Sequence, residues 1–198
     1  MKAQPCPRCG FLHQCVCGDI PQIESSLRFV LLQHPNEPAR LSNSGKLLHW
    51  FGLKVECMIW QRQTPPPQWQ ALVEDPALFP VLLYPHPQAY TLPQVQQSSA
   101  AQQRQSVFVI LDGTWQEARK MIKKSEWLAQ LPCLSISSRA ESAYQLRRNQ
   151  QPGNLCTMEI AAELLAQSGE VAQAQQMQQF LQHYLQVFHA DRSGHSLK

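Results

Sequence analysis

Apolar and polar residues follow two different periods along this chain, and the periods separate expected strands from expected helices. Short apolar runs occupy residues 27–32, 55–60, 79–84, 107–111 and 133–138. Such runs are typical of strands that are buried on both faces of a parallel sheet. Helices are expected over residues 68–74, 114–129, 157–167 and 170–190, with a loop that runs into a helix over 39–51. Strands that alternate with helices predict an α/β fold around a mostly parallel sheet.

Two stretches show neither period. Residues 85–105 are rich in Gln, Pro and Ser, and we interpret them as a long surface loop. Residues 138–154 are also irregular and include the turn-forming sequence Pro152-Gly153-Asn154. After this turn, Thr157 is placed to cap the next helix, with Glu159 in its first turn.

The strand at 107–111 leads into the most informative unit of the chain. It ends at Asp112, and Thr114 and Glu117 then have the spacing of a capping box, which marks the start of a helix. One apolar stripe is expected on that helix, made by Ala118, Met121, Ile122, Leu128 and Ala129. Ligands of open α/β sheets bind at the carboxyl ends of strands, where Asp112 lies. A local role in the turn is the alternative for this carboxylate.

Charge gathers in the same part of the chain. Residues 104–148 hold eight Lys/Arg against four Asp/Glu, a net of +4, whereas the whole chain has +3. Four of these cations share the polar side of the expected helix: Arg119, Lys120, Lys123 and Lys124. A nucleic acid is one partner that such a surface fits, and a solvated helix face is the other interpretation. Arg147 and Arg148 are further candidates for phosphate contacts.

Composition sets the general frame. Hydrophobic residues make up 43% of 198 residues, enough for one domain with a small appendage. No apolar run approaches the roughly 18 residues of a membrane span, and the first residues lack the apolar core of a signal peptide. We therefore expect no membrane partner and a cytoplasmic, reducing location in which disulfides are rare.

Four of the seven cysteines, Cys6, Cys9, Cys15 and Cys17, fall within twelve residues among turn-forming prolines and glycines. A segment this small has no core of its own, and four thiolates around a tetrahedral Zn²⁺ would fold it. With four protein ligands the site would be structural. His13 is an alternative ligand, and a redox pair or unpaired thiols are the other interpretations.

Three separated segments together resemble the DTW-domain family, which is named for an Asp-x-Thr-Trp motif. They are residues 32–48, residues 111–118 with Asp112, Thr114 and Trp115, and residues 155–161. The cysteine spacing also fits the family. Within it the resemblance is strongest to the bacterial tRNA-uridine aminocarboxypropyltransferases. Cys156 departs from the Ser that the family more often has there, but a backbone amide contact would survive this change.

The resemblance implies a fold and an activity. The fold would be a SPOUT-like α/β domain over residues 23–198, with a C-terminal trefoil knot, preceded by a zinc knuckle over residues 1–22. The activity would be transfer of the 3-amino-3-carboxypropyl group of S-adenosylmethionine (SAM) to N3 of a uridine in tRNA, releasing 5′-methylthioadenosine. Knots of this kind are rare exceptions among protein folds.

It also implies roles for particular residues. Asp112 would be the base that takes the N3 proton, or a ligand of the SAM ammonium group. Thr114 belongs to the same catalytic motif, and Trp115 would stack on a base or pack in the core. SAM would contact Gln33, His34, Glu37, Ser44, Gly45, Leu111, Gly113, Leu155, Cys156, Thr157 and Glu159.

Two other functions stay open at the level of sequence. A SPOUT-type RNA methyltransferase would use the same cofactor but release S-adenosylhomocysteine. A non-enzymatic zinc-ribbon RNA-binding module would leave the Asp112–Thr114 turn without a purpose. The sequence does not indicate which tRNA or which uridine is modified, and it leaves the oligomeric state open, a monomer included.

Overall fold

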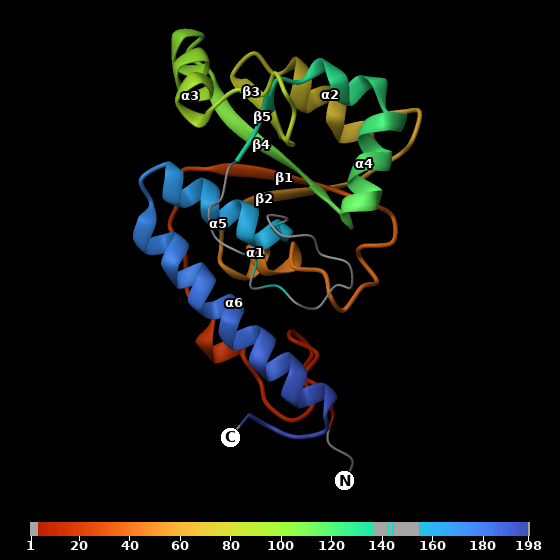
Figure 1. The fold of residues 1–198 in the computed structure, drawn as a ribbon, viewed down its shortest axis with the longest axis vertical. Coiled ribbons are helices and arrows are strands. Elements are labelled where there is room, and N and C mark those ends of the chain that lie inside the picture. The colour runs from red at the N-terminus through yellow and green to blue at the C-terminus, as the bar shows by residue number, and fades with distance from the viewer. Residues whose placement is uncertain (1–3, 137–141, 143, 145–154, 198) are drawn as a thin grey trace.

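The computed structural model of this protein describes residues 4–136, 142, 144 and 155–197 (Figure 1). The described residues form five strands in one sheet: β1 (Arg28–Gln33), β2 (Lys54–Ile59), β3 (Leu78–Leu83), β4 (Gln105–Asp112) and β5 (Cys133–Leu134). The α-helices of this part of the chain are α1 (Lys46–Trp50), α2 (Pro67–Glu74), α3 (Leu92–Ala101), α4 (Trp115–Lys124), α5 (Thr157–Gln167) and α6 (Val171–Arg192). It also contains the short 3₁₀ helices η1 (Cys17–Asp19) and η2 (Glu126–Gln130).

The sheet has the order β2-β1-β4-β3-β5, and every pair that the described strands form is parallel. The expected α/β class and parallel sheet are therefore confirmed, with strand ends within two residues of the predicted ones except in β5. β1 and β4 lie side by side with Gln33 opposite Asp112. Their carboxyl ends thus meet at one edge of the sheet.

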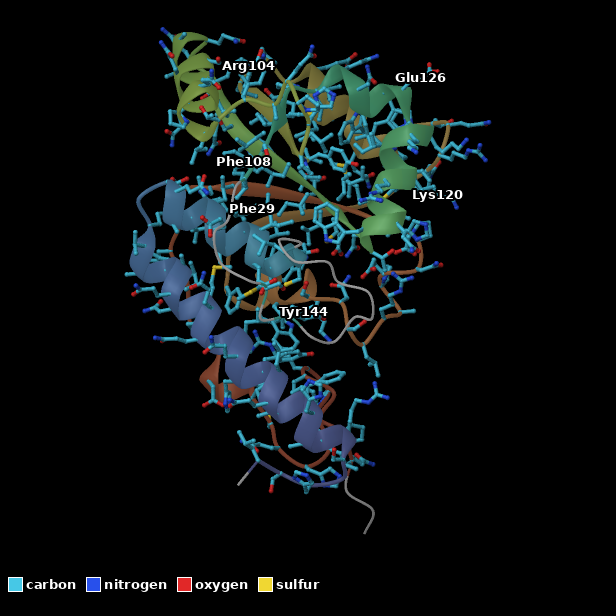
Figure 2. All side chains as sticks on the ribbon, viewed as in Figure 1. Phe29, Arg104, Phe108, Lys120, Glu126 and Tyr144 are labelled. Atoms are coloured by element: carbon cyan, nitrogen blue, oxygen red, sulfur yellow. The ribbon has the colours of Figure 1, made fainter. Side chains whose placement is uncertain are left out.

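Alternate residues of each strand enter different cores, as the two-residue period of a strand requires. Phe29, Leu31, Phe108 and Ile110 face the side covered by α1, α5 and α6, while even-numbered β1 residues such as Leu32 face α2 and α4 (Figure 1). Figure 2 shows Phe29 and Phe108 near each other at the sheet, and their ring centroids lie 6.4 Å apart. Burial on both faces explains why the strands are continuous apolar runs.

Residues 85–105 are not a surface loop, and this prediction was wrong. The stretch contains the ten-residue helix α3, which begins with a capping box between Thr91 and Gln94. Leu92 and Val95 are buried on its inner side, while its other residues are largely polar. The apolar stripe is so narrow that the helical period is hard to detect in a sequence rich in Gln and Ser.

The helix after the Asp112 turn is shorter than expected. α4 ends at Lys124, and the extended backbone of Ser125 interrupts it. The buried Ser125 hydroxyl accepts a hydrogen bond from Trp60 Nε1 at 2.8 Å, which favours the break. Leu128 is buried from η2, whereas Ala129 is exposed. The two residues are therefore not part of one stripe with Ala118.

The last two helices agree closely with the sequence. α5 covers residues 157–167 as predicted, and α6 is displaced by one or two residues. The predicted cap of α5 was wrong, because Cys156 occupies the N-cap position and Thr157 is the first helical residue. The predicted fifth strand is confirmed only for Cys133–Leu134, and much of the irregular stretch 138–154 lies outside the described residues.

The cysteine segment, residues 4–22, lies against the C-terminal end of α6 (Figure 1). Phe11 packs on Tyr184 and Phe188, with ring centroids 5.3 and 6.0 Å apart, and belongs to the same buried cluster as α5 and α6. Asp191 Oδ1 accepts hydrogen bonds from the backbone amides of Leu12 and His13 at 2.8 and 2.7 Å. Among the described residues, no helix has the length and hydropathy needed to cross a bilayer.

Candidate functional site

The turn between β4 and α4, residues 112–117, is held by its own side chains. Thr114 Oγ1 accepts a hydrogen bond from the Glu117 amide at 3.2 Å, and Glu117 Oε2 accepts one from the Thr114 amide at 2.8 Å. The predicted capping box is confirmed. It fixes the start of α4 directly after the carboxyl end of β4, where the cleft described below opens.

Asp112 is fully buried at the end of β4. Its Oδ2 accepts hydrogen bonds from Gln33 Nε2 at 2.9 Å and Asn43 Nδ2 at 2.8 Å, and its Oδ1 accepts one from Thr157 Oγ1 at 2.7 Å. Both carboxylate oxygens are thus satisfied by side-chain donors of the protein itself. Asp112 therefore joins the end of β1, the loop before α1 and the start of α5.

Gly45 explains how a backbone can pass so close to this carboxylate. A Cβ at position 45 would lie 2.8 Å from Asp112 Oδ2 and 3.0 Å from its Cγ. Only a residue without a side chain fits this approach. Gly45 was predicted to contact the cofactor; among the described contacts, it is Asp112 that it faces.

A cleft opens at the carboxyl ends of β3 and β4, and its walls come from distant parts of the chain. Its empty space, counting the part open to solvent, is about 910 Å³. Its described lining is Ser44, Leu83, Tyr84, Ile110, Leu111, Gly113, Thr114, Trp115, Gln116, Ala118, Tyr144, Leu155, Cys156, Thr157 and Ile160. All three segments that carried the family resemblance therefore meet here.

The predicted site residues fall into two groups, those that line the cleft and those that do not. Of the eleven cofactor candidates named above, six line it: Ser44, Leu111, Gly113, Leu155, Cys156 and Thr157. Thr114 and Trp115 line it as well, and Trp115 is only partly buried there. Gln33, His34, Glu37, Gly45, Glu159 and Asp112 are not part of its described lining. These six lie behind or beside the walls.

Sequence reasoning missed the aromatic and aliphatic part of the cleft. Tyr84 follows the carboxyl end of β3, so the rule that singled out Asp112 would also have found it. Tyr144 comes from the irregular stretch and is buried, with its hydroxyl donating to the carbonyl of Ser42. Ile110 and Ile160 are apolar residues of β4 and α5, and nothing in their local sequence distinguishes them from core residues.

The start of α5 forms the second wall. Glu159 Oε2 accepts hydrogen bonds from the Cys156 amide at 2.8 Å and from Ser142 Oγ at 2.6 Å. Burial raises the pKa of the Cys156 thiol well above its ordinary value, so this sulfur stays protonated. α4 and α5 thus both begin at the cleft, each with a glutamate in its first turn.

Behind the cleft, the loop between β1 and α1 carries a polar side chain at every third position. The amides of Glu37, Arg40 and Asn43 bond to the carbonyls three residues earlier, at 2.8 to 3.1 Å, so the loop winds in successive turns. Asn43 donates to Glu37 Oε2 and to Asp112 Oδ2, both at 2.8 Å. Sequence reasoning named Glu37 from this set but neither Arg40 nor Asn43.

Arg40 links this loop to the first turn of α4. Its Nη1 and Nη2 donate to Glu117 Oε2 and Oε1 at 2.6 and 2.8 Å, and Nη1 also contacts Glu37 Oε1. Burial raises the pKa of Glu117, but hydrogen bonds from Arg40 and Thr114 outweigh it and lower that pKa to about 2. Glu117 is therefore ionised at neutral pH.

His34 lies beside the same glutamate. Its Nδ1 is 3.2 Å from Glu117 Oε1, and its ring stacks on Trp60 with centroids 5.7 Å apart. The side chain is largely buried, and it is not among the described residues that line the cleft. The contacts with Glu117 and Trp60 therefore indicate a structural role for His34.

The four cations of α4 lie on its exposed side. Arg119, Lys120, Lys123 and Lys124 are all exposed, and Lys120 is labelled in Figure 2 at the outer surface of the helix. The helix begins at the cleft, but none of these four cations is in the described lining. Arg147 and Arg148, the other predicted contacts, lie outside the described residues.

The four N-terminal cysteines come together as their spacing predicted. Their Sγ atoms all lie within 4.8 Å of one another, with three of the distances at 3.6, 3.7 and 3.9 Å. A tetrahedral ion with metal–sulfur bonds near 2.3 Å would set its sulfurs about 3.8 Å apart. The arrangement is consistent with a metal site.

Comparisons with known proteins agree with the resemblance to the DTW-domain family. The family model described as the DTW domain matches residues 3–190. The chain is similar to tRNA-uridine aminocarboxypropyltransferase 2 of Drosophila melanogaster, 28% identical over 171 residues. The match covers 83% of this chain and 65% of that relative, so the chain spans less than two thirds of the relative's length. No solved structure matches the chain.

Proposed function

Since the chain belongs to the DTW domain family, we propose that it transfers the 3-amino-3-carboxypropyl group of SAM to N3 of a uridine in tRNA, with 5′-methylthioadenosine as the second product. The observation that carries the proposal is the cleft. Ser44, the segment Gly113–Trp115 and the segment Leu155–Thr157 are far apart in the chain but line one cavity. The name of the Drosophila relative supports the same reaction. That this chain is a bacterial member stays a prediction.

The lining fits the two halves of SAM. Tyr84, Trp115 and Tyr144 offer flat apolar surface for the adenine ring, and Ile110 and Ile160 add aliphatic contacts. α4 and α5 both begin at the cavity, and the positive end of a helix dipole favours an anion such as the carboxylate of the methionine part. The remaining predicted cofactor residues would act from behind these walls.

The reaction is a substitution at carbon. A new bond forms between uridine N3 and Cγ of SAM, the Cγ–sulfur bond breaks, its electron pair stays on sulfur, and the N3 proton leaves to a base. All three carbons on the sulfonium are electrophilic, so the site must select Cγ by placing N3 in line with it. Positioning by the cleft walls is therefore the main task of the protein.

Asp112 would act in one of three ways: as the general base, as a cofactor ligand, or as a residue that positions its neighbours. Its complete burial and its three donors support the third, in which the carboxylate positions Gln33, Asn43 and Thr157. The base role stays a prediction that the Asp112→Asn variant tests. Thr114 is proposed to shape the turn, and Trp115 to stack on the adenine or on the target base.

The proposal also includes the metal, the fold and the RNA. Zn²⁺ is proposed to occupy the four-cysteine cluster, because its sulfur spacing and all-thiolate ligand set suit a closed structural site. On the basis of the family resemblance, we propose a SPOUT-like fold with a trefoil knot and a domain boundary at residue 22. On the basis of charge, we propose that the basic face of α4 contacts tRNA. Arg147 and Arg148 would add to that face.

Incubation with SAM and bulk tRNA, followed by mass spectrometry of the nucleosides, tests the function. We expect a uridine that has gained the aminocarboxypropyl group, together with methylthioadenosine. A methylated nucleoside with S-adenosylhomocysteine would identify a methyltransferase instead. A protein that binds tRNA but no SAM, measured by calorimetry, would be a non-enzymatic RNA-binding module.

A further inference from the structure

We propose that Arg40 and Asn43 are positioning residues for the transfer reaction. They would hold the 112–117 turn and Ser44 in the geometry that the cleft requires, without touching SAM or RNA. This inference rests on the proposed function. Its basis is a set of five side chains, Glu37, Arg40, Asn43, Asp112 and Glu117, which we call the carboxylate network.

The network connects both ends of the turn to one loop. Asp112 stands at its first position and Glu117 at its last. Asn43 donates to Asp112, and Arg40 donates through both Nη atoms to Glu117. The residues between them, Gly113 to Gln116, all line the cleft. Two residues of one loop thus fix both ends of a cleft wall.

Both donor hydrogens of the Asn43 amide are used within the protein. Its Nδ2 donates at 2.8 Å to Glu37 Oε2 and at 2.8 Å to Asp112 Oδ2, and its Oδ1 accepts from the Lys46 amide at 2.8 Å. Both carboxylates are fully buried. Through its two hydrogen bonds the Asn43 amide joins the two buried carboxyl groups, and the next residue, Ser44, belongs to the cleft wall.

Arg40 neutralises the other side of the network. It is the cation bonded to both Glu37 and Glu117, and its side chain is 29% exposed. A guanidinium can bond two carboxylates at once through its planar fork, whereas a lysine ammonium cannot reproduce that geometry. Of the carboxylate network, no member is in the described lining of the cleft. The network therefore acts through the backbone that it holds.

The Asn43→Asp variant tests the amide link through its pH dependence. When the new carboxyl is protonated it donates one hydrogen bond, and when it is ionised it adds a third negative charge beside Glu37 and Asp112. We expect SAM affinity at about pH 8 to fall at least about tenfold below wild type and to recover towards it at about pH 5.5. Wild-type affinity should change little over this range.

The Arg40→Lys variant tests the guanidinium link. It keeps the charge but loses the fork, so we expect kcat/KM to fall about tenfold, mainly through kcat, with the protein still folded. The matched control is Arg104→Lys. Arg104 is also partly buried and lies over the Phe79 ring, just before β4 and at the other end of that strand from Asp112. Figure 2 labels it well away from Lys120 of α4, and the substitution should change activity less than about twofold.

The outcomes separate the network from the function. Far-ultraviolet circular dichroism at the assay temperature reports whether each variant is folded, and Arg40→Lys is informative even where Asn43→Asp unfolds. Two results together would overturn the inference. Asn43→Asp would bind SAM as tightly as wild type at both pH values, and Arg40→Lys would keep the wild-type kcat. If wild type binds SAM but forms another product, the proposed reaction fails, while SAM affinity still tests the network. A wild-type protein that binds no SAM would overturn both.

Discussion

The cleft and the cysteine segment are both built largely from chain outside the strands, but different interactions hold them. At the cleft, Asp112 and Glu117 are fixed by hydrogen bonds from residues that lie 45 to 81 positions away, except for those within the turn. The cysteine segment is held by four clustered thiols and by Phe11 packed on α6. The first region is held by hydrogen bonds within the protein, and the second has a four-cysteine cluster that is consistent with a metal site.

This difference shows in what cysteine does in each region. Cys6 belongs to a set of four sulfurs at metal-site spacing. Cys156 lines the cleft at the N-cap of α5, where its backbone amide is bonded to Glu159. A Cys→Ser substitution should therefore have a large effect at Cys6 and a small one at Cys156.

Removal of the metal is expected to have the largest effect. Cys6→Ser, or chelation of the wild-type protein, should unfold residues 4–22, because a closed structural site supplies much of the folding energy of such a segment. Elemental analysis should give about one zinc per wild-type chain and a loss of it in the variant. SAM affinity should be nearly unchanged, since the described cleft lining includes no residue of the segment.

Cys57→Ser is the matched control, since Cys57 is exposed on β2 and lies outside the cluster. A loss of SAM affinity in proportion to zinc loss would show that the two regions are not independent. It would place the cysteine segment in the active site.

Two substitutions of Asp112 are expected to act on the cleft alone. Asp112→Ala leaves the buried donors of Gln33, Asn43 and Thr157 without an acceptor, at about 1–3 kcal/mol for each unsatisfied group, and should abolish SAM binding. Asp112→Asn keeps the shape and an acceptor oxygen, so SAM affinity should stay near wild type.

Turnover of Asp112→Asn separates the proposed roles. If Asp112 is the general base, kcat should fall by about 100- to 10,000-fold. If the carboxylate only positions its neighbours, the loss should be far smaller, and a loss confined to SAM affinity would indicate an ammonium ligand. Single-turnover measurements with saturating SAM provide the comparison.

The next prediction concerns which of the two regions binds RNA. Lys123 and Lys124 are exposed in the last turn of α4, and each phosphate contact adds roughly 0.7 to 0.9 to the slope of log affinity against log salt. Replacing both with Gln should flatten the slope for tRNA by about 1.5 and leave SAM binding intact. Lys54→Gln, on the edge strand β2, is the control. An unchanged slope would direct attention to the cysteine segment.

The smallest effect is expected for Cys156→Ser. A serine hydroxyl caps a helix at least as well as a thiol, and the Cys156 amide keeps its bond to Glu159. The free energy of unfolding should change by less than about 1 kcal/mol, and SAM affinity should be retained. Thermal unfolding and calorimetry measure both. A marked loss of affinity would mean that the sulfur itself contacts the ligand.

The sequence by itself determined the elements of this protein and several of their ends. The five strands, the capping box of α4 and the cysteine cluster depend on residues close together in the chain, and local spacing encodes them. The helix α3 was not predicted, because its buried side consists only of Leu92, Val95 and the small Ser99. Periodicity fails where a helix covers little of the core.

Only the tertiary structure decided what the polar residues of the site do. Thr157 was expected to cap its own helix, yet its hydroxyl donates to Asp112, which is 45 residues away. Asp112 was placed at a strand end by sequence, but its burial and its donors come from three other segments. A buried carboxylate must find partners wherever the fold brings donors, and that pairing has no local period from which it could be predicted.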